Sequence, residues 1–485
     1  MKWIRIGVFF MAMLSVIFCS ALQLCAQSVL ALAPGVREFV KVSAPVVALT
    51  HVRVIDGTSS AAREDQTIII SDGKIQSIGD SASTPAPSGA QVLDLTGKTV
   101  TPGLVGMHEH MFYPAGDRAV ALYNEMGFSF PRLYLACGVT SLRTTGAVEP
   151  YTDLELRKLI NEGKLAGPKI HVTGPYLEGA GSYTPNMHEL TGPEDARRTV
   201  NYWADEGVTS FKAYMHITRA ELAAAIDAVH KRHLRITGHL CSVGFKEAAA
   251  LGIDNLEHGL MVDTEFDPGK TPDVCPSQQL TAQTLAKIDV EGPQVQDTIR
   301  DLVAHHVAIT STLPVFETFV PNQPPLERRV IDALLPEAAI AYLGQRSVIG
   351  QSTNSPWPAL LKKEMQFEYD FVKAGGVLLA GEDPTGYGGD LAGFGDQREL
   401  ELLVQTGFTP VEAVHIYTEN GARFLGEDDR VGTLATGKQA DIVVIDGDPS
   451  KNIGDIEKTE LVFKDGVGYD SAKLIASVRG SVGLH

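Results

Sequence analysis

Two histidines flank a glutamate at the end of an apolar run, in the stretch VGMHEHM at residues 105–111. On a β-strand, residues i and i+2 share one face, so His108 and His110 would point the same way and could coordinate one ion. Histidine pairs at this spacing also occur as exposed or hydrogen-bonded side chains without any ligand. The pair alone therefore leaves a metal site and an ordinary pair of histidines both open.

Further along the chain, other residues of metal-binding or acid–base type close short apolar runs; they are Lys212, His239, His258 and Asp383. Each has an ordinary explanation when taken alone. A lysine can extend its ammonium to water, a core histidine can bond to backbone, and an aspartate can cap a turn. Whether these residues act together depends on the elements that carry them.

Short buried strands alternate with amphipathic helices through the middle of the chain. The strand-like runs are VTPGLVGMHEH (100–110), TSLRTTG (140–146), PKIHVTG (168–174), VTSFKAYM (208–215), RITGHL (235–240), IDNLEHG (253–259), VAITSTL (307–313) and GVLLAGED (376–383). Such a block of β/α units favours fold class α/β with a closed (β/α)8 TIM barrel, whose reactive groups lie at the carboxyl ends of the strands. All the candidate residues stand at such ends. If each had an unrelated role, all of them would have to occupy strand ends by chance, so a shared site is the better explanation.

The two ends of the chain carry a different pattern. Residues 46–102 and 430–470 consist of short β-branched runs separated by Asp-Gly, Gly-Asp and Thr-Gly turns. We predict that they form one composite β-sandwich domain, with the barrel at 103–425. The connections at roughly 260–300 and 315–365 are longer than a strand-to-helix link needs, so we expect them to cover a substrate.

The donor set favours a particular kind of metal. Neutral imidazoles and a carboxylate suit borderline divalent ions, zinc foremost. Lys212 is the unusual member, because an ammonium repels a dication. Its presence suggests that carbon dioxide has converted the amine to a carbamate, which is an anion able to bridge two metals.

Together these residues resemble the metal-dependent amidohydrolase superfamily in its two-metal, carboxylated-lysine form. VTPGLVGMHEH is similar to the family's opening motif, although Gly106 stands where many members have aspartate or asparagine, and GTLATGKQADIVVIDGDP (432–449) resembles its closing motif. FKAYM, GHL, NLEHG and the GED strand look most like the prolidase-like and imidazolonepropionase-like branch. The resemblance covers nearly all of the chain after residues 1–26.

The resemblance implies a binuclear site. His108, His110 and Asp383 would hold one ion, His239 and His258 the other, and carboxylated Lys212 would lie between them. A metal-bridging hydroxide would attack the substrate, with Asp383 as general acid and base. Glu178 is a reserve ligand, because other branches use a glutamate in place of the lysine.

Strand alternation and loop position suggest further roles. Glu382 should point away from the metals, and the same alternation makes Glu109 and Glu257 at best groups that support the ligands or pack beside them. Tyr214, His216 and Arg143 are candidate substrate contacts, and packing roles for them remain equally open.

We expect hydrolysis of a C–N amide bond in a dipeptide, an N-acyl amino acid or a cyclic amide. A lactonase or phosphotriesterase is the alternative, because the same site attacks esters and phosphorus centres. An exported binding protein without turnover is a third reading, which the complete ligand set argues against. A one-metal deaminase would not need Lys212.

Composition and the first residues restrict partners and location. The formal charge of −18 disfavours nucleic acid and anionic membranes, and leaves a small molecule, with a homo-oligomer open. Residues 1–26 read as a signal peptide, which predicts a periplasmic or secreted protein; an uncleaved membrane anchor is the alternative. The remaining cysteines, Cys137, Cys241 and Cys275, are an odd set without CxxC spacing, so we expect no disulfide framework.

Overall fold

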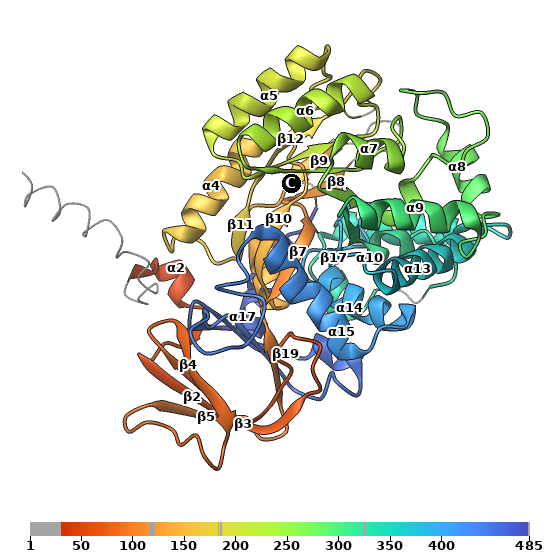
Figure 1. Ribbon diagram of the computed structural model, residues 1–485. Helices are drawn as coiled ribbons and strands as arrows, with labels where there is room; N and C mark the ends of the chain where they lie inside the picture. The colour runs from red at the N-terminus through yellow and green to blue at the C-terminus, as the bar shows by residue number, and fades with distance from the viewer. Residues whose placement is uncertain (1–30, 116–121, 183, 185–186, 324–325, 484–485) are drawn as a thin grey trace, which may run out of the picture.

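The computed structural model describes residues 31–115, 122–182, 184, 187–323 and 326–483 (Figure 1). The predicted signal peptide at 1–26 lies outside these residues. Among the helices that are described, none combines the length and the apolarity needed to cross a bilayer.

A sheet of nine strands joins the two ends of the chain, in the order β1-β20-β19-β18-β6-β2-β3-β4 with β5 beside β2. Its first part comprises β1 (Val40–Val42), β2 (Val46–Val54), β3 (Arg63–Ser71), β4 (Lys74–Asp80), β5 (Gln91–Asp94) and β6 (Thr99–Pro102). Its second part comprises β18 (Ile442–Ile445), β19 (Thr459–Lys464) and β20 (Val467–Asp470). In Figure 1 the red and orange strands therefore lie beside blue segments from the far end of the chain. Apolar side chains from both parts share one buried cluster, which explains why the ends pair.

The middle of the chain is mixed α/β, and its main strands pair in parallel. They are β7 (Leu104–Glu109), β10 (Val139–Thr144), β11 (Lys169–His171), β12 (Thr173–Leu177), β13 (Ser210–Ala213), β14 (Arg235–Gly238), β15 (Asn255–Glu257), β16 (Ala308–Ser311) and β17 (Leu378–Ala380). One sheet has the order β11-β10-β7 and the other runs β12 to β17. The sheets meet where Asp383 N donates to His108 O at 3.0 Å and Ala147 N donates to Gly174 O at 3.2 Å.

Helices follow these strands and cover them. They are α3 (Phe130–Ala136), α4 (Pro150–Asn161), α5 (Pro193–Glu206), α6 (Arg219–Lys231), α7 (Phe245–Leu251), α9 (Pro293–Ala304), α13 (Trp357–Lys373) and α14 (Phe394–Thr406). In α6, Thr218 and Glu221 form a capping box at the first turn, and an apolar stripe of Leu222, Ile226 and Val229 is buried. This stripe follows the period of the α-helix, so the amphipathic pattern of the sequence decides which face packs on the strands.

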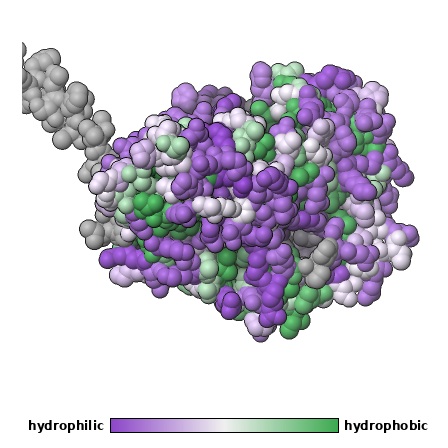
Figure 2. Space-filling view, turned by 90° about the horizontal axis from the view of Figure 1, so that it is seen from below, coloured by the Kyte–Doolittle hydropathy of each residue, from purple (hydrophilic) through white to green (hydrophobic). Residues whose placement is uncertain are grey.

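Additional elements gather at the carboxyl ends of the parallel strands. They are β8 (Phe112–Ala115), β9 (Leu122–Glu125), η2 (Gly259–Val262), α8 (Gln278–Leu285), α10 (Leu313–Glu317), α11 (Arg328–Ile331) and α12 (Pro336–Gly350). The other short elements are α2 (Pro34–Arg37), α15 (Pro410–His415), η3 (Ile416–Asn420), α16 (Gly421–Leu425), η4 (Ile453–Glu457) and α17 (Ser471–Ser477). Figure 2 shows a face of the molecule that is mainly hydrophilic, with apolar residues in small groups.

One disulfide corrects the expectation from the cysteine pattern. Cys241, which follows β14, is bonded to Cys275 in the segment before α8, and Cys137 is a buried free thiol. The partners are 34 residues apart in sequence, yet their Cα atoms lie 4.9 Å apart. Only the path of the segment after β15 brings them together, so cysteine spacing could not reveal the pair.

Candidate metal centre and its cavity

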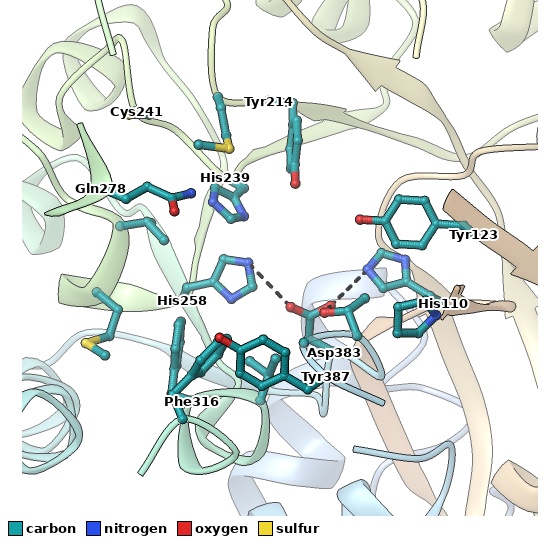
Figure 3. Close-up of a pocket in the computed structure, with 18 of the residues that line it drawn as sticks. His110, Tyr123, Tyr214, His239, Cys241, His258, Gln278, Phe316, Asp383 and Tyr387 are labelled. Carbon is teal, nitrogen blue, oxygen red and sulfur yellow. Dashed lines mark hydrogen bonds and ion pairs between the residues drawn. The ribbon is translucent and has the colours of Figure 1, made fainter. Parts of the chain in front are cut away.

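Asp383, directly after β17, lies among histidines from other strand ends. Its carboxylate is 3.2 Å from His110 Nε2, 3.7 Å from His108 Nε2 and 3.9 Å from His258 Nε2. Figure 3 shows the carboxylate between His258 and His110, with a dashed line to each. Residues from β7, β15 and β17 therefore meet at one point, as their positions at strand ends predict.

Lys212 and His239 complete the group. Lys212 Nζ lies 3.1 Å from His108 Nε2, and the ring centres of His239 and His258 are 4.5 Å apart. His239 is half-buried, whereas the other members, including Lys212, are buried. The structure thus brings together every metal ligand that the sequence predicts: His108, His110, Lys212, His239, His258 and Asp383.

Hydrogen bonds at the outer ring nitrogens orient the imidazoles. His108 Nδ1 donates to Glu257 at 2.7 Å, and His110 Nδ1 donates to the carbonyl of Gly146 at 3.2 Å. His258 Nδ1 is 2.7 Å from Thr312 Oγ1. Because these contacts occupy Nδ1, each Nε2 faces the centre, which is the arrangement that metal-ligating histidines adopt.

One buried atom tests whether this donor set fits a metal. His258 Nε2 is buried and has no hydrogen-bond partner among the described residues. A buried polar atom without a partner is costly, and a cation at the centre would satisfy it. His108, His258 and Asp383 also place ligand atoms within 4.8 Å of one another. Nitrogen and carboxylate donors in this arrangement fit a divalent ion.

Burial gives these groups the protonation states that metal binding needs. It lowers the pKa of His110 to about 4 and that of His239 to about 3, so both rings are neutral near pH 7. Burial also lowers the pKa of Lys212 to about 8, against the attraction of Glu257 and Asp383. Although burial opposes ionisation of Asp383, the imidazole of His108 and its neighbours hold the pKa of this carboxyl well below its usual range.

Arg143 supports the centre from behind instead of facing a substrate. Its guanidinium is buried and donates to Glu257 at 2.8 Å, to Asn255 and to the carbonyl of Met107. Burial tends to raise the pKa of Glu257, but Arg143 and His108 lower it to about 2. Arg143 therefore does not line the cavity, and its Nε and Nη2 atoms bond instead to Met107, Asn255 and Glu257.

The remaining predicted contacts fall in different places. Tyr214 lines the cavity, with its ring centre 5.0 Å from that of His239. The backbone N–H of His216 donates to Glu178 at 2.7 Å, and its Nδ1 lies 3.3 Å from the same carboxylate. Glu178 also accepts from Gly179 N, so it orders the loop after β12, and neither Glu178 nor His216 lines the cavity.

Glu109 and Glu382 lie away from the centre, as strand alternation predicts. They meet Asp396 of α14, and all three carboxyls are buried. Burial, with repulsion between the neighbouring acids, raises the pKa of Glu109 and of Glu382 well above the usual range. A Cβ at Gly106 would lie 2.4 Å from Glu109 Oε1, so the glycine that departs from the family motif leaves room for this carboxyl.

The centre forms the floor of a cavity of about 930 Å³. The segments after β15 and β16, which we expected to cover a substrate, line it through Met261, Leu285, Phe316, Phe319 and Trp357. Tyr387, from the segment after β17, joins this group of aromatic residues. The amino-acid sequence alone does not reveal these aromatic residues as a group. They come from α10, from the first residue of α13 and from two loops, so no single period shows that their side chains share a face.

Comparison with known proteins adds the family context. A profile described as the amidohydrolase family matches residues 99–468. An imidazolonepropionase of Nocardia farcinica is 26% identical over 401 residues, which cover 79% of this chain and 86% of that protein. A dihydroorotase of Pelotomaculum thermopropionicum is 25% identical over 411 residues, covering 80% and 86% respectively.

Solved structures show the same fold at lower identity. A Xaa-Pro dipeptidase with bound methionine has a TM-score of 0.65 and 20% identity, covering 88% of this chain and all of that one. A bottromycin amidohydrolase has a TM-score of 0.65 and 19% identity, with 93% of each chain covered.

Proposed function

The chain belongs to the amidohydrolase family, and from this premise we propose that it is a metal-dependent hydrolase that cleaves an amide C–N bond. Amidohydrolases are hydrolases of C–N bonds, so this reaction class is the general function of the chain. The observation that carries the metal-dependent mechanism is the convergence of His108, His110, His258 and Asp383, with a buried His258 Nε2 that accepts or donates no hydrogen bond among the described residues.

The proposed metal site uses all six predicted ligands. His108, His110 and Asp383 would hold one ion and His239 and His258 the other, with Lys212 between them. Two divalent ions, for which we propose zinc, would polarise the substrate carbonyl and lower the pKa of water. Because the pKa of Lys212 is about 8, part of this amine is neutral near pH 7. A neutral amine adds to CO2, forming an N–C bond and releasing a proton, which gives the proposed carbamate.

Asp383 is the proposed general acid and base. It stays ionised because its imidazole neighbours lower its pKa, and it lies on the floor of the cavity beside His110. It can therefore take a proton from the attacking water and deliver it to the leaving nitrogen. Tyr214, on the cavity wall next to His239, would help to orient the substrate.

We also propose the architecture that this function implies. The contact of Asp383 N with His108 O beside β7 and β17 supports closure of the parallel strands into a (β/α)8 barrel over 103–425. The apolar cluster shared by strands from both ends of the chain supports a β-sandwich domain from 46–102 and 430–470. Proteolysis followed by mass spectrometry tests these boundaries, because cleavage should fall between the units before it falls within them.

Export is a further proposal. The Cys241–Cys275 disulfide supports it, because disulfides persist mainly in oxidising compartments. The proposed signal peptide at 1–26 can be tested by sequencing the N-terminus of the protein recovered from a bacterial host. A periplasmic product that begins near residue 27 supports export, and a membrane-bound product that retains Met1 supports the anchor alternative.

A substrate panel tests the function directly. Metal-replete enzyme would be assayed with Xaa-Pro and other dipeptides, N-acyl amino acids, cyclic amides, lactones and organophosphates. We expect turnover of at least one amide class, and loss of that turnover after chelation with recovery when zinc is restored. Turnover of lactones or organophosphates alone would overturn the proposed bond specificity.

A further inference from the structure

Four aromatic side chains extend from the metal centre along one side of the cavity: Phe316, Phe319, Trp357 and Tyr387, here called the aromatic wall. The rings of Phe316 and Trp357 are nearly parallel at 6.2 Å and 19°, and those of Phe319 and Trp357 at 4.5 Å and 18°. Tyr387 meets Phe319 edge-on at 4.7 Å. Figure 3 shows Phe316 and Tyr387 below His258 and Asp383.

The wall is built on the core but is not part of it. Phe316 and Trp357 pack against a buried cluster that contains Leu313, Val320 and Leu361. All the wall residues are nevertheless only half-buried and line the cavity. Core phenylalanines such as Phe367 are completely buried. Residues that served only to fill the core would be buried to the same extent, so the open faces of the wall are available to a ligand.

The wall begins next to the reacting groups. The ring of Phe316 lies 5.7 Å from the ring of His258, with their planes at 81°. His258 is in turn 3.9 Å from Asp383. A substituent on an amide bound over Asp383 can therefore reach the wall while the amide stays at the centre.

The surroundings of the wall disfavour a negative charge. Neighbouring cavity residues are mainly apolar, among them Val315 and Leu360, and Glu337 adds an acidic side chain. In the part of the chain that the structure describes, Lys212 is the only lysine or arginine that lines this cavity. A carboxylate at the wall would lose its water without gaining a cationic partner there.

Resting on the proposed amide hydrolysis, we propose that the aromatic wall is a substrate subsite for an uncharged, planar aromatic group. The substrates are then amides that carry an aryl substituent on one side of the scissile bond. Offset and edge-on contacts with flat rings favour an aromatic group over a saturated ring of the same size. The aromatic wall extends beyond Phe316, so it can accept a fused ring system as well as a single ring.

The test compares matched amides that differ only in one ring. Benzamide-type and cyclohexanecarboxamide-type substrates with the same leaving amine form one series, and benzylamides and cyclohexylmethylamides of the same acid form the other. We expect kcat/KM to favour the aryl member about five- to tenfold in one series. Trp357→Leu should reduce this ratio towards one, whereas Trp203→Leu, the same change in α5 outside the cavity, should leave it unchanged.

A binding measurement separates this inference from the proposed function. The affinity of uncharged 2-naphthylmethanol and of its decahydro analogue would be measured on the parent and on both variants. Turnover without aryl preference in either series, together with equal affinity for the two alcohols, would overturn the subsite and leave the hydrolase intact. Aryl-selective binding that Trp357→Leu abolishes, without turnover of any amide, would support the subsite and overturn the proposed function.

Discussion

His108 Nδ1 donates a 2.7 Å hydrogen bond to Glu257, and both side chains are completely buried. The second carboxylate oxygen pairs with Arg143 at 2.8 Å. This chain of contacts fixes the tautomer and the orientation of His108, and it keeps Glu257 ionised. Residues on the far side of the ligand thus decide how the first histidine of the HEH stretch presents its Nε2.

Removing the charge of Glu257 should weaken metal binding. We expect Glu257→Gln to lower metal affinity and activity about 10- to 100-fold, because the amide accepts the His108 proton less strongly. Metal content would be measured by mass spectrometry after dialysis against graded chelator. The double variant Glu257→Gln/Arg143→Met removes the buried unpaired guanidinium and should recover stability but not affinity. Full metal affinity in Glu257→Gln would refute the role of Glu257 in holding His108 for metal binding.

Adjacent acids at the end of β17 should respond in opposite ways. Asp383→Asn removes the proposed general acid and base and should lower kcat about 10²- to 10⁴-fold. Glu382→Gln should retain most of the activity, since burial and repulsion by Asp396 raise the pKa of Glu382 and favour its neutral form, for which an amide is a close substitute. Steady-state kinetics on the two variants test this prediction. Equal losses of kcat would contradict the assignment of Asp383 to the candidate metal centre and of Glu382 to the opposite face.

Lys212→Ala should lose activity at least about 100-fold, because the proposed carbamate bridge is missing. Short carboxylates such as formate or propionate should restore part of it by occupying the vacated space. The assay would titrate each carboxylate on metal-replete variant, with chloride at equal ionic strength as the control. An alanine variant with parental activity and two bound metals would rule out the bridge.

Asp153 should make the folded state less stable as the pH rises. Burial raises its pKa from 3.8 to about 7, with opposition from a hydrogen bond to Thr144. Between these values the folded state holds a proton that the unfolded state has lost, so stability falls from about pH 4 to about pH 7. Asp153→Asn removes this loss and should be more stable than the parent by up to about 4 kcal/mol at pH 8.

At pH 4 the same variant should lie within about 0.6 kcal/mol of the parent, because the folded carboxyl is then protonated and about two-fifths of the unfolded chains also hold the proton. Urea unfolding at both pH values measures the difference. Glu155→Gln, on the exposed side of the same helix α4, is the matched control. A stability gain that does not change with pH would exclude titration of Asp153 as its cause.

The Cys241–Cys275 bond should hold the segment before α8 against the cavity. Cys275→Ser should increase amide exchange in residues 263–285 at least about tenfold, because the freed segment opens more easily. Hydrogen exchange with mass spectrometry reports this change, and Cys137→Ala controls for loss of a thiol outside the disulfide. Unchanged exchange in both the variant and the reduced parent would show that packing alone orders the segment.

Much of the candidate site could be predicted from sequence. His108 and His110 share a face because side chains alternate along a strand, and Lys212, His239, His258 and Asp383 each end a strand in a block of β/α units. The membership of the chain in the amidohydrolase family, predicted from these residues and the flanking motifs, is confirmed by the profile match over residues 99–468. Local periodicity places the candidate ligands at strand ends, and the resemblance of the flanking motifs indicates the family.

Contacts between distant segments were decided only by tertiary structure. Arg143 looked equally suited to a substrate carboxylate, yet its buried position beside Glu257 directs it to the support of His108. The pairing of Cys241 with Cys275, and the meeting of Phe316 with Trp357, depend on the paths of long connections. Periodic strands and helices reveal which side chains share a face, whereas irregular segments take their conformation from whatever they pack against.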